Sequence, residues 1–399
     1  MRRRRPEVLF VGHEASRTGA PLMLLYFLRW IRENTDLTFE VVLLDGGPLV
    51  DELRKLGPVR VLSDLRDRRA SRWLVWARLD RQAAMVRGVL ARRWLSHLRA
   101  VPTIYCNSVS SLRVLRLLGR SPRVVISHVH ELQGALGMPG TEDDRRLLQT
   151  QADWVVAASD LVADYLVRQH GIAPERVVRH YEFIEVDAFL AQVPEQVADL
   201  RSELGIPPDA AVVGAVGVTE ARKGPDLFLM LAMSFRRRDL GRPLHLVWVG
   251  ANPDTRETRW LKHDIEKSGL ADTVHLVGPQ AVPAPWFELF DAFALTSRED
   301  PFPLVCLETS LLGTPMVCFD NTGMSEFAGD GDCGFVVPYL DIEAMADRVQ
   351  QLLTDATLGE DVGRRAAARV RALHDVSSAA PALFADLEAW RHGPGGTGG

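Results

Sequence analysis

The stretch AFALTSREDPFPLVCLETSLLGTPMV, from Ala292 to Val317, contains the pattern that decides the fold. Its first six residues are rich in apolar side chains and predict a strand, and the polar residues after them predict a loop at the carboxyl end of that strand. A helix is expected from Pro303 to about Leu312, with Pro303 in the first turn, where its missing N–H costs nothing. A Gly-Thr-Pro sequence then stops the helix, and a second strand follows. This order is typical of a parallel sheet covered by helices.

The same alternation continues through the rest of the chain. Thirteen short apolar or β-branched runs alternate with helical patterns, which predicts an α/β fold whose parallel sheets are buried on both faces. The predicted strands are EVLFVG, FEVVLLD, VRVLS, TIYCN, VVISHV, WVVAAS and RVVRHY in the first half, and AVVGAVG, LHLVWVG, VHLVG, AFALTS, PMVCFD and GFVVP in the second.

The length of 399 residues points to two domains, because one hydrophobic core rarely serves more than about 250–300 residues. The strand series breaks near residues 185–203, so we expect an N-terminal domain over residues 1–186 and a C-terminal domain over residues 187–375. Two doubly wound domains imply a cleft between them, with ligands beyond the carboxyl ends of the strands. The GPGGTGG sequence at residues 393–399 predicts a disordered tail over 392–399.

Composition narrows the class of protein. The chain has no run of 18 apolar residues, and its basic start leads directly into a predicted strand, so we expect neither a membrane span nor a signal peptide. Its four cysteines lack paired spacing, which favours reduced thiols in a cytoplasmic protein over disulfides or a zinc site.

Charge is spread unevenly between the two halves. Residues 1–186 contain 29 Lys and Arg against 21 Asp and Glu, a net charge of +8, whereas residues 187–399 contain 18 against 31, a net charge of −13. This asymmetry suggests two domains with different partners. Residues 64–99 contain ten arginines and a helical apolar stripe that ends at Trp94 and Leu98. The stripe fits a helix docked on the first domain, and the arginines also predict weak, salt-sensitive contact with an anionic membrane surface. We expect no nucleic-acid partner.

Two acids lie eight positions apart in the opening stretch. Asp300 is in the loop, and Glu308 follows on the helix, with leucines one turn before it and one turn after it. A carboxylate on a leucine stripe loses hydration, which costs several kcal/mol unless a partner compensates. A pair of ribose hydroxyls would satisfy Glu308. The alternative is a glutamate at the edge of the stripe that reaches water or a local arginine.

A cationic loop follows the predicted strand AVVGAVG. Arg222 and Lys223 precede a Gly-Pro helix start, and Lys223 is one of only four lysines in the chain. Two cations beside a helix N-terminus suit a diphosphate, whose negative charge grows when the bond to a sugar breaks. The alternative is a solvated basic turn.

The first domain offers two further candidates. Gly19 lies in a small-residue loop that opens a helix after the first strand, although the loop is not a G-x-G-x-x-G motif, and an ordinary helix start explains it equally well. His128 and His130 share one face of a later strand. A two-histidine metal pair is conceivable there, but such residues are more often packed and hydrogen-bonded.

These motifs resemble the signature of retaining glycosyltransferases of family 4, which have the GT-B architecture of two Rossmann-like domains facing a cleft. Their signature is an acid, Gly-Phe-Gly, four further residues and a glutamate, and here Asp300-Pro301-Phe302-Pro303 is followed by Glu308. The similarity continues through an Asn-Thr-Gly-Met loop and GFVVP, and covers most of residues 205–350. Prolines replace the two glycines beside the phenylalanine, and Met324 replaces a glycine of the later loop. An amide contact at Pro303 is excluded, because proline has no N–H.

The resemblance implies roles for individual residues. Asp300 would hold hydroxyls of the donor sugar, Glu308 the nucleotide ribose, and Lys223 the diphosphate, while His130 would lie against the donor sugar. A last helix over residues 376–391 would pack back on the N-terminal domain, as in similar proteins. The catalytic candidates are Lys223, Arg222, His130 and Asp300, and the donor-binding candidates are Glu308, Phe302, Pro303, Leu304, Gly19 and Gly217.

The resemblance therefore predicts a glycosyltransferase that moves a sugar from a nucleotide-diphosphate sugar to an acceptor hydroxyl with retention of configuration. We expect UDP as the nucleotide, an acceptor bound by the basic domain, and no cofactor or metal. Asp330-Gly331-Asp332 looks like a metal-binding Asp-x-Asp motif, but we expect only a turn there. Two alternatives stay open: a nucleotide-sugar epimerase or phosphorylase of the same fold, and a nucleotide-sugar-binding protein without catalysis.

Overall fold

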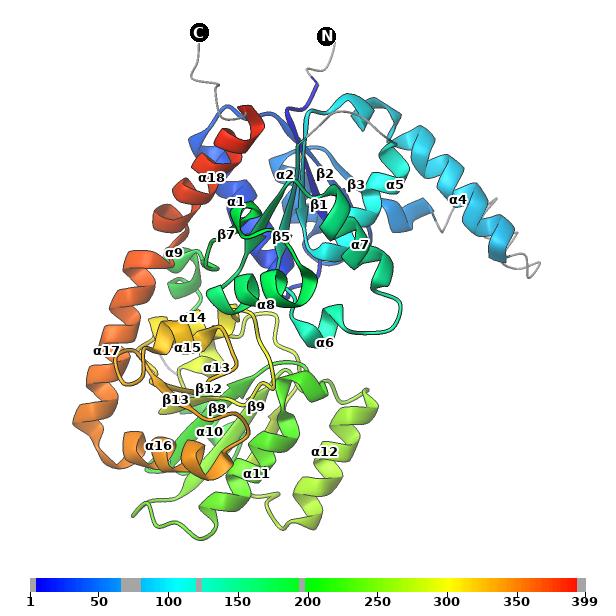
Figure 1. Ribbon diagram of the computed structural model, residues 1–399. Coiled ribbons are helices and arrows are strands. Elements are labelled where there is room, and N and C mark those ends of the chain that lie inside the picture. Colours follow the sequence, from blue (N-terminus) through cyan, green and yellow to red (C-terminus); the bar gives the residue numbers. More distant parts are fainter. Residues whose placement is uncertain (1–4, 66–79, 120–123, 194–197, 393–399) are drawn as a thin grey trace. The chain divides into compact units, whose positions relative to one another are not determined.

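The computed structural model describes residues 5–65, 80–119, 124–193 and 198–392 (Figure 1). The chain divides into two compact units. Unit 1 comprises Met1–Tyr181 together with the residues from Ala379 onward, and unit 2 comprises Glu182–Ser378. The predicted tail falls almost entirely outside the described residues, as do residues 66–79 of the arginine-rich segment 64–99.

Unit 1 is built on a parallel sheet of seven strands in the order β3-β2-β1-β4-β5-β6-β7. Its strands are β1 Val8–Gly12, β2 Phe39–Leu43, β3 Val59–Val61, β4 Thr103–Asn107, β5 Val124–Val129, β6 Trp154–Ala157 and β7 Val177–Arg179. Its described α-helices are α1 Gly19–Asn34, α2 Val50–Leu56, α4 Asp80–Trp94, α5 Leu115–Leu118, α6 Gln133–Leu136, α7 Glu142–Gln151, α8 Asp160–His170 and most of α18 Val376–His392. Short 3₁₀ turns are η1 Leu62–Leu65, η2 Ser96–Ala100, η3 Val109–Val114 and η4 Pro174–Arg176.

Unit 2 is built on a parallel sheet of six strands in the order β10-β9-β8-β11-β12-β13. Its strands are β8 Ala211–Val216, β9 Leu244–Val249, β10 Val274–Val277, β11 Ala292–Leu295, β12 Met316–Phe319 and β13 Phe335–Val337. Its described helices are α9 Val186–Leu190, α10 Ala198–Glu203, η5 Ala221–Lys223, α11 Pro225–Phe235, α12 Arg256–Lys267, α13 Ala284–Phe287, α14 Leu304–Leu311, α15 Met324–Ala328, α16 Ile342–Thr354 and α17 Ala356–Leu373.

Every one of the thirteen predicted runs forms a strand, and the predicted fold class is confirmed. The apolar runs are buried because helices cover both faces of each parallel sheet, as β1 and β4 show with all five residues buried. One local expectation is wrong. Pro303 lies before α14 with an extended backbone rather than in its first turn, and the helix begins at Leu304. Among the described residues, no helix combines the length and the apolar character needed to cross a lipid bilayer.

The boundary between the units lies a few residues before the one expected at residue 186. Residues 182–186 belong to unit 2 because their backbone is bound there. The amide of Ile184 donates to the carbonyl of His374 at 2.9 Å, and Val376 donates back to Ile184 at 2.9 Å.

The C-terminal helix α18 packs on unit 1 through aromatic and charged contacts. Trp390 stacks on Trp154 with ring centroids 5.4 Å apart, and Phe384 lies 5.6 Å from Trp30. Arg391, nearly buried, donates to Glu7 at 3.0 Å. These three contacts place the helix against the residues around β1, α1 and β6.

The strand order of each sheet reverses at one point, and this point locates the crevice of a doubly wound sheet. In unit 1 the reversal lies between β1 and β4, and in unit 2 between β8 and β11. Chain segments leaving adjacent strands at such a point turn to opposite sides, so their loops frame a site at the carboxyl edge. The loops after β8 and β11 are those that contain Lys223 and Asp300.

We predict that Gly214→Ala destabilises unit 2 by about 1–3 kcal/mol, because overpacking a filled core forces neighbouring side chains to move. A Cβ atom at Gly214, inside β8, would lie 2.2 Å from the ring of Phe290. Urea unfolding measures the change. Gly278→Ala is the matched control, since its Cβ would approach no atom closer than 4.0 Å. Equal unfolding midpoints for the two variants would contradict this packing.

Candidate functional site

The loops after β8 and β11 touch through their backbones. Gly224 has a left-handed backbone with φ of 69°, and a Cβ atom there would lie 2.0 Å from the carbonyl oxygen of Thr296. Only glycine allows this approach. The hydroxyl of Thr296 donates to the Gly224 carbonyl at 3.0 Å, which closes the contact from the other side. The two loops therefore form one rigid element at the switch point of unit 2.

A buried ion pair joins these loops. Lys223 Nζ donates to Asp300 Oδ2 at 2.7 Å, and Ser297 Oγ donates to the same oxygen at 3.1 Å. Arg222 lies 3.5 Å from that carboxylate oxygen. The structure thus brings together three of the four predicted catalytic residues, Lys223, Arg222 and Asp300. Gly217 belongs to the same cluster, because the stem of Lys223 passes over it and an added Cβ would lie 3.2 Å from that stem.

Asp300 stays ionised in this setting. Burial by itself would raise the pKa of its carboxyl, but Lys223 and Arg222 outweigh that effect, and the pKa lies below its usual value. The pair presents a fixed negative group toward ligand hydroxyls and a fixed positive group beside it. Such a preorganised pair suits a ligand with hydroxyls next to an anion.

Arg298 holds the cationic loop in place, and our sequence analysis did not single it out. Its guanidinium donates to both carboxylate oxygens of Asp226 at 2.9 and 2.7 Å, and to the carbonyl of Ala221 at 2.7 Å. Its amide donates to the carbonyl of Arg222 at 2.7 Å. The hydrogen bond from Arg298 is the main cause that lowers the pKa of Asp226. An arginine directly after one switch-point strand, with an acid in the first turn of the helix after the other, is the signal that could have revealed this clamp.

Glu308 lies on α14 in an apolar setting, as expected. It is only 8% exposed, and no hydrogen bond or ion pair joins its carboxylate to another described residue. Burial raises its pKa to about 7. A buried carboxylate without a partner is costly, so it is better explained by a ligand with hydroxyl donors than by the fold alone. The sequence left open a local arginine as the partner of Glu308, and the described residues contain no such pair.

A ring contact and a backbone hydrogen bond fix the proline-containing loop between Asp300 and α14. Phe302 is buried and stacks on His374 with ring centroids 5.3 Å apart. The amide of Gly323 donates to the Asp300 carbonyl at 2.9 Å. Pro303 and Leu304 are buried at the start of α14. Packing and a backbone bond from the neighbouring loop thus fix this segment, although prolines replace the glycines of the family signature.

In unit 1, the candidates Gly19 and His130 both adjoin Asn107 at the end of β4. Asn107 donates to the carbonyl of Ala20 at 2.7 Å, and its side-chain oxygen lies 3.1 Å from His130 Nε2. A Cβ atom at Gly19 would meet nothing within 4 Å, so packing does not explain that glycine. Sequence reasoning missed Asn107, although its place at the end of a switch-point strand was the available signal.

The rings of the two predicted histidines of unit 1 are in contact and tilted against each other. His128 and His130 have ring centroids 4.1 Å apart, and His128 Nδ1 lies 2.8 Å from the hydroxyl of Tyr105. Burial, with further contributions from His130 and His180, holds the pKa of His128 well below its usual range. His128 is therefore a neutral, packed residue, and His130 is the one that is partly exposed at the strand end.

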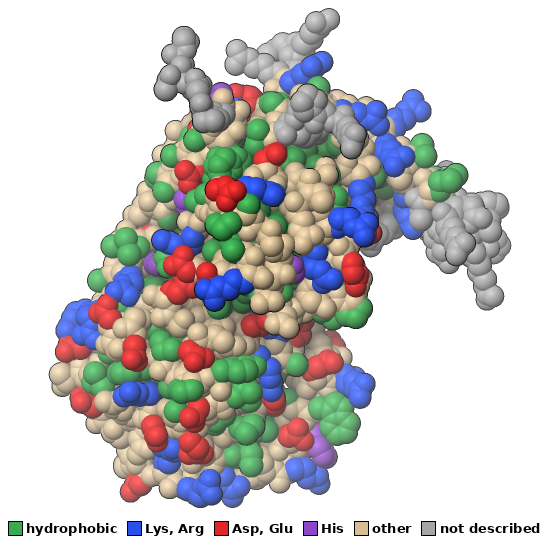
Figure 2. Space-filling model, in the orientation of Figure 1, with side chains coloured by type: hydrophobic (Ala, Val, Ile, Leu, Met, Phe, Trp, Pro, Cys, Tyr) green, Lys and Arg blue, Asp and Glu red, His purple; other side chains and the backbone are tan. Residues whose placement is uncertain are grey.

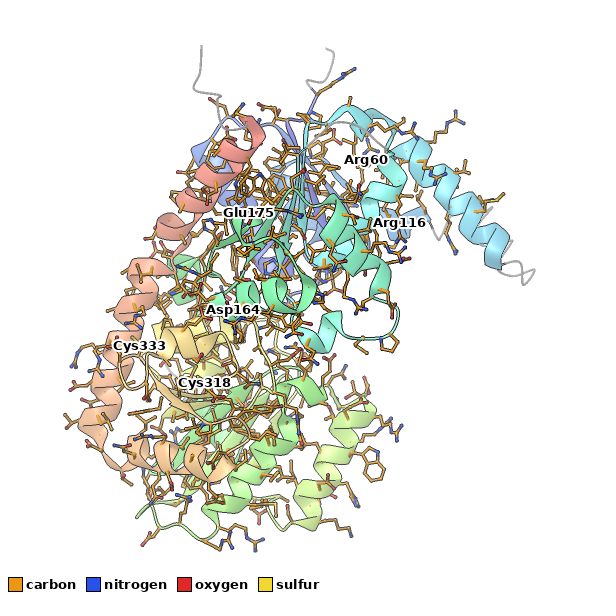
Figure 3. The ribbon with its side chains drawn as sticks, viewed as in Figure 1. Arg60, Arg116, Asp164, Glu175, Cys318 and Cys333 are labelled. Atoms are coloured by element: carbon orange, nitrogen blue, oxygen red, sulfur yellow. The ribbon has the colours of Figure 1, made fainter. Side chains whose placement is uncertain are left out.

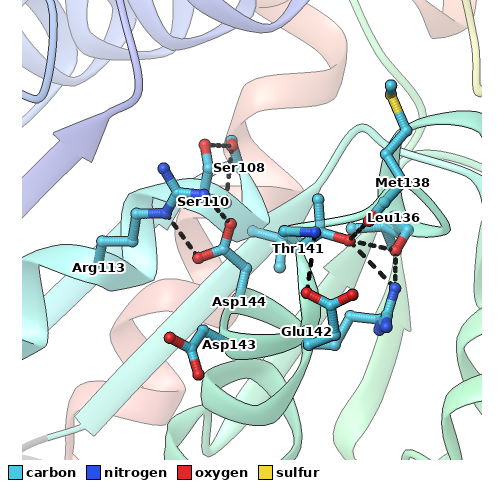
Figure 4. A network of polar contacts seen from close by, with 12 residues as sticks. Ser108, Ser110, Arg113, Leu136, Met138, Thr141, Glu142, Asp143 and Asp144 are labelled. Carbon is cyan, nitrogen blue, oxygen red and sulfur yellow. Dashed lines mark hydrogen bonds and ion pairs between the residues drawn. The ribbon is translucent and has the colours of Figure 1, made fainter.

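The segment after β4 is strained and braced. Ser108 is a non-glycine residue with φ of 149°, a conformation that costs energy and concentrates at functional sites. Glu131 braces it by accepting the amide of Val109 at 3.1 Å, and Arg113 forms a bidentate pair with Asp144 at 2.7 and 2.6 Å (Figure 4). These contacts tie the loops after β4 and β5 into one support for His130.

The Asp330-Gly331-Asp332 sequence forms the expected turn before β13. Gly331 donates to the Gly334 carbonyl at 2.6 Å, and Asp332 pairs with Arg365 and Arg369 of α17. Two arginines already neutralise the second acid of the motif.

The predicted apolar stripe of residues 64–99 packs at its C-terminal end. Leu98 is buried, and Val86, Leu90 and Trp94 of the stripe are partly buried, whereas Met85 and Val89 of α4, outside the stripe, are 69% and 58% exposed. Within the described residues, the stripe is thus partly buried along α4 and buried at its end.

Comparison with known proteins agrees with this geometry. Residues 196–369 match the family Glycosyl transferases group 1. The chain is 30% identical over 228 residues to a D-inositol 3-phosphate glycosyltransferase of Paenarthrobacter aurescens, covering 57% of this chain and 55% of that protein. It is 28% identical over 214 residues to the lipopolysaccharide core biosynthesis mannosyltransferase LpsB of Rhizobium meliloti, covering 53% and 58%. The chain spans about half the length of the curated relatives it matches.

Solved structures resemble the whole described chain. Anabaena Alr3699/HepE, crystallised with UDP and glucose, superimposes with a TM-score of 0.77 at 19% identity, covering 96% of this chain and all of that one. Sucrose-phosphate synthase from Thermosynechococcus elongatus gives 0.74 at 21% identity, covering 97% and 100%. These likenesses establish the fold.

The class of protein follows from the two sheets and the site at the switch point: the fold is that of a GT-B glycosyltransferase. More particularly, residues 196–369 of the chain are similar to the glycosyl transferases group 1 family. The resemblance found in the sequence is therefore confirmed.

We predict that between pH 5 and pH 8 the unfolding free energy of Glu308→Gln depends less on pH than that of the parent protein. A carboxyl whose folded pKa is about 7, above the ordinary value of 4.5, stabilises the fold fully below pH 4.5 and loses that contribution as the pH rises through 7. The loss is about 3 kcal/mol. The difference in unfolding free energy between variant and parent should therefore grow from pH 5 to pH 8, in favour of the variant. Urea unfolding at each pH measures it, and a constant difference would contradict an uncharged, buried Glu308 at low pH.

Proposed function

We propose that the protein transfers a sugar from a nucleotide-diphosphate sugar to an acceptor hydroxyl, with retention of the anomeric configuration. The observation that carries this proposal is the buried Lys223–Asp300 pair at the switch point of unit 2, with the unpartnered Glu308 on the adjoining helix. The Lys223–Asp300 pair offers a cation and a carboxylate that accepts hydrogen bonds from hydroxyls. Glu308 offers a second carboxylate of that kind. A nucleotide sugar has the matching groups: a diphosphate, sugar hydroxyls and ribose hydroxyls.

Each group has a defined task in this proposal. Breaking the bond between the anomeric carbon and the diphosphate leaves negative charge on the leaving group and an oxocarbenium-like sugar. The ammonium of Lys223 and the guanidinium of Arg222 stabilise that leaving charge without having to reorganise, because the loops already hold them. Asp300 accepts hydrogen bonds from the sugar hydroxyls and orients the ring. Retention means that the acceptor oxygen attacks the face from which the diphosphate leaves.

Glu308 is proposed to bind the ribose. Two hydroxyl donors would replace the hydration that the carboxylate loses on burial, and they would favour its ionised form. Because such contacts are alike in the ground and transition states, Glu308 serves binding more than turnover. We propose UDP as the nucleotide, a choice supported by Anabaena Alr3699/HepE, whose structures contain UDP or UDP-glucose.

The acceptor is proposed to be a hydroxyl compound bound by unit 1, with His130 as a residue of that unit's site. The bracing of the loops after β4 and β5 supports a fixed site there, because it holds His130 against Asn107. We place the protein in the cytoplasm, with contact to the membrane surface as a further possibility for residues 64–99.

A panel of nucleotide sugars tests the proposal. UDP-glucose, GDP-mannose and ADP-glucose should each be added to the protein in a thermal unfolding assay. A ligand at about 100 times its Kd adds about 2.7 kcal/mol of stability, which is readily detected. We expect a shift with a UDP-sugar, and Glu308→Ala should reduce it. No shift with any nucleotide sugar would remove the proposal, and a shift without sugar transfer to any acceptor would instead favour a binding protein without catalysis.

We predict that Lys223→Ala lowers kcat by about 10²–10³, with a smaller effect on donor affinity. The ammonium faces charge that develops only as the diphosphate departs, so its loss falls on the transition state. Steady-state kinetics with the donor found in the panel measures the effect. The control is Lys262→Ala, which removes a lysine from α12, outside the loops described above. An unchanged kcat in a folded Lys223→Ala protein would refute the role.

We predict that transfer does not require a divalent metal, because Lys223, Arg222 and helix termini meet the diphosphate charge. Activity should persist after treatment with a chelator and dialysis. Loss of transfer that manganese or magnesium restores would show that a metal takes part.

A further inference from the structure

A second charged site lies at the opposite edge of the sheet in unit 1. A cavity of about 830 Å³ is lined by arginines, with Arg5, Arg60, Arg92, Arg99 and Arg116 around it. We call it the arginine cavity. Among the described residues of its lining, the charged or titratable ones besides the arginines are Glu40 and His97. Five arginines against one glutamate give these described residues a net charge of +4 before His97 is counted.

The arginine cavity lies away from the candidate site described above. It lies at the edge of the sheet where the strands begin: Pro6 precedes β1, Glu40 is near the start of β2, and Ala100 precedes β4. His130 and Asn107 are at the other ends of β5 and β4. A strand of five residues rises roughly 16 Å, so the two edges are distinct. The donor and acceptor roles proposed above leave this cavity unexplained.

Side-chain contacts connect the residues of the arginine cavity that lie next to the sheet. Glu40 is buried, and its Oε2 accepts from His97 Nε2 at 3.0 Å and lies 3.7 Å from Arg60. Arg60 also lies over the ring of Trp94 at 5.2 Å, which ties β3 to the end of α4. The single carboxylate among the described lining residues is therefore engaged with two of the basic residues, Arg60 and His97.

The remaining arginines come from separate elements and converge on the same space. Arg92 belongs to α4 and Arg116 to α5, and Arg116 has one exposed ion pair, with Asp143 at 3.0 Å. Figure 3 shows Arg60 and Arg116 on this part of unit 1, and Figure 2 shows blue side chains gathered over α5 and the adjoining end of α4. Like charges that converge in a concave site repel one another unless an anion compensates them.

We propose that the arginine cavity binds an anion that carries two or more phosphate groups. Guanidinium groups bind phosphate oxygens with paired N–H donors, and they are the preferred residues for that task. A single phosphate group carries a charge of about −2, so two or more phosphate groups match the net charge of +4 in the described lining better than one does. The volume also fits an organic ligand rather than a single ion. Such phosphates could belong to a soluble molecule or to a lipid headgroup, and the test separates the two.

The first arm measures binding of inorganic tripolyphosphate by calorimetry. The protein carries Lys223→Ala throughout, so that the donor loops contribute little. We expect saturable binding that weakens by about tenfold or more in Arg92→Ala/Arg116→Ala, because two charge-assisted contacts to phosphate are lost. The control is Arg93→Ala/Arg146→Ala, which removes the same charge from α4 and α7 at residues outside the cavity lining. No saturable binding, or an equal loss in both double variants, overturns the proposal.

The second arm uses sedimentation with phosphatidylcholine vesicles, with and without phosphatidic acid. Pelleting that requires phosphatidic acid and Arg92 with Arg116 identifies a lipid headgroup as the source. Tripolyphosphate binding without such pelleting identifies a soluble ligand. Should the double variant fold poorly, protection of Arg92 and Arg116 from phenylglyoxal by tripolyphosphate gives the answer in the parent protein. Equal modification with and without tripolyphosphate then counts against the site.

Discussion

The buried ion pair between Lys223 and Asp300 is the interaction on which the candidate site of unit 2 depends. It joins the loops after β8 and β11, the two strands that flank the switch point. Asp300 is buried, and its charge would be strongly destabilising without a cationic partner. The close backbone approach at Gly224 and the clamp from Arg298 hold the loops at the distance that the pair requires. Site geometry and local stability in unit 2 therefore have the same origin.

The two acids of the site show how environment separates similar groups. Asp300 has two cationic neighbours and a pKa below its usual value, whereas Glu308 has none and a pKa of about 7. A carboxylate that is already satisfied is rigid and orients a ligand, whereas an unsatisfied one gains from a ligand that supplies donors. Two carboxylates of unit 2 thus differ in pKa because their partners differ, although both are buried.

Much of this could be predicted from the sequence, because each strand is a short apolar run and each sheet is covered on both faces. The grouping of Arg222, Lys223 and Asp300 followed from their places after strands and from the family resemblance. Arg298 and Asn107 were missed, since their roles depend on strand order, which alternation alone does not specify. We predicted Pro303 in the first turn of the helix, but it lies one residue before α14, because proline suits either position. The arginine cavity gathers residues from five segments far apart in the chain, and only the folded sheet brings them together.

The lack of a partner for Glu308 has a consequence for how long the protein survives. Under the proposed function, the ligand-free form bears the cost of a dehydrated carboxylate, and a bound nucleotide relieves it. Proteases and chaperones act on the unfolded form in proportion to its population. A modest change in the free energy of unfolding therefore alters the amount of protein in the cell several-fold. The amount of protein would then follow the supply of donor, with no dedicated regulator. A fold that leaves one acid unsatisfied thereby links its own persistence to the presence of its substrate.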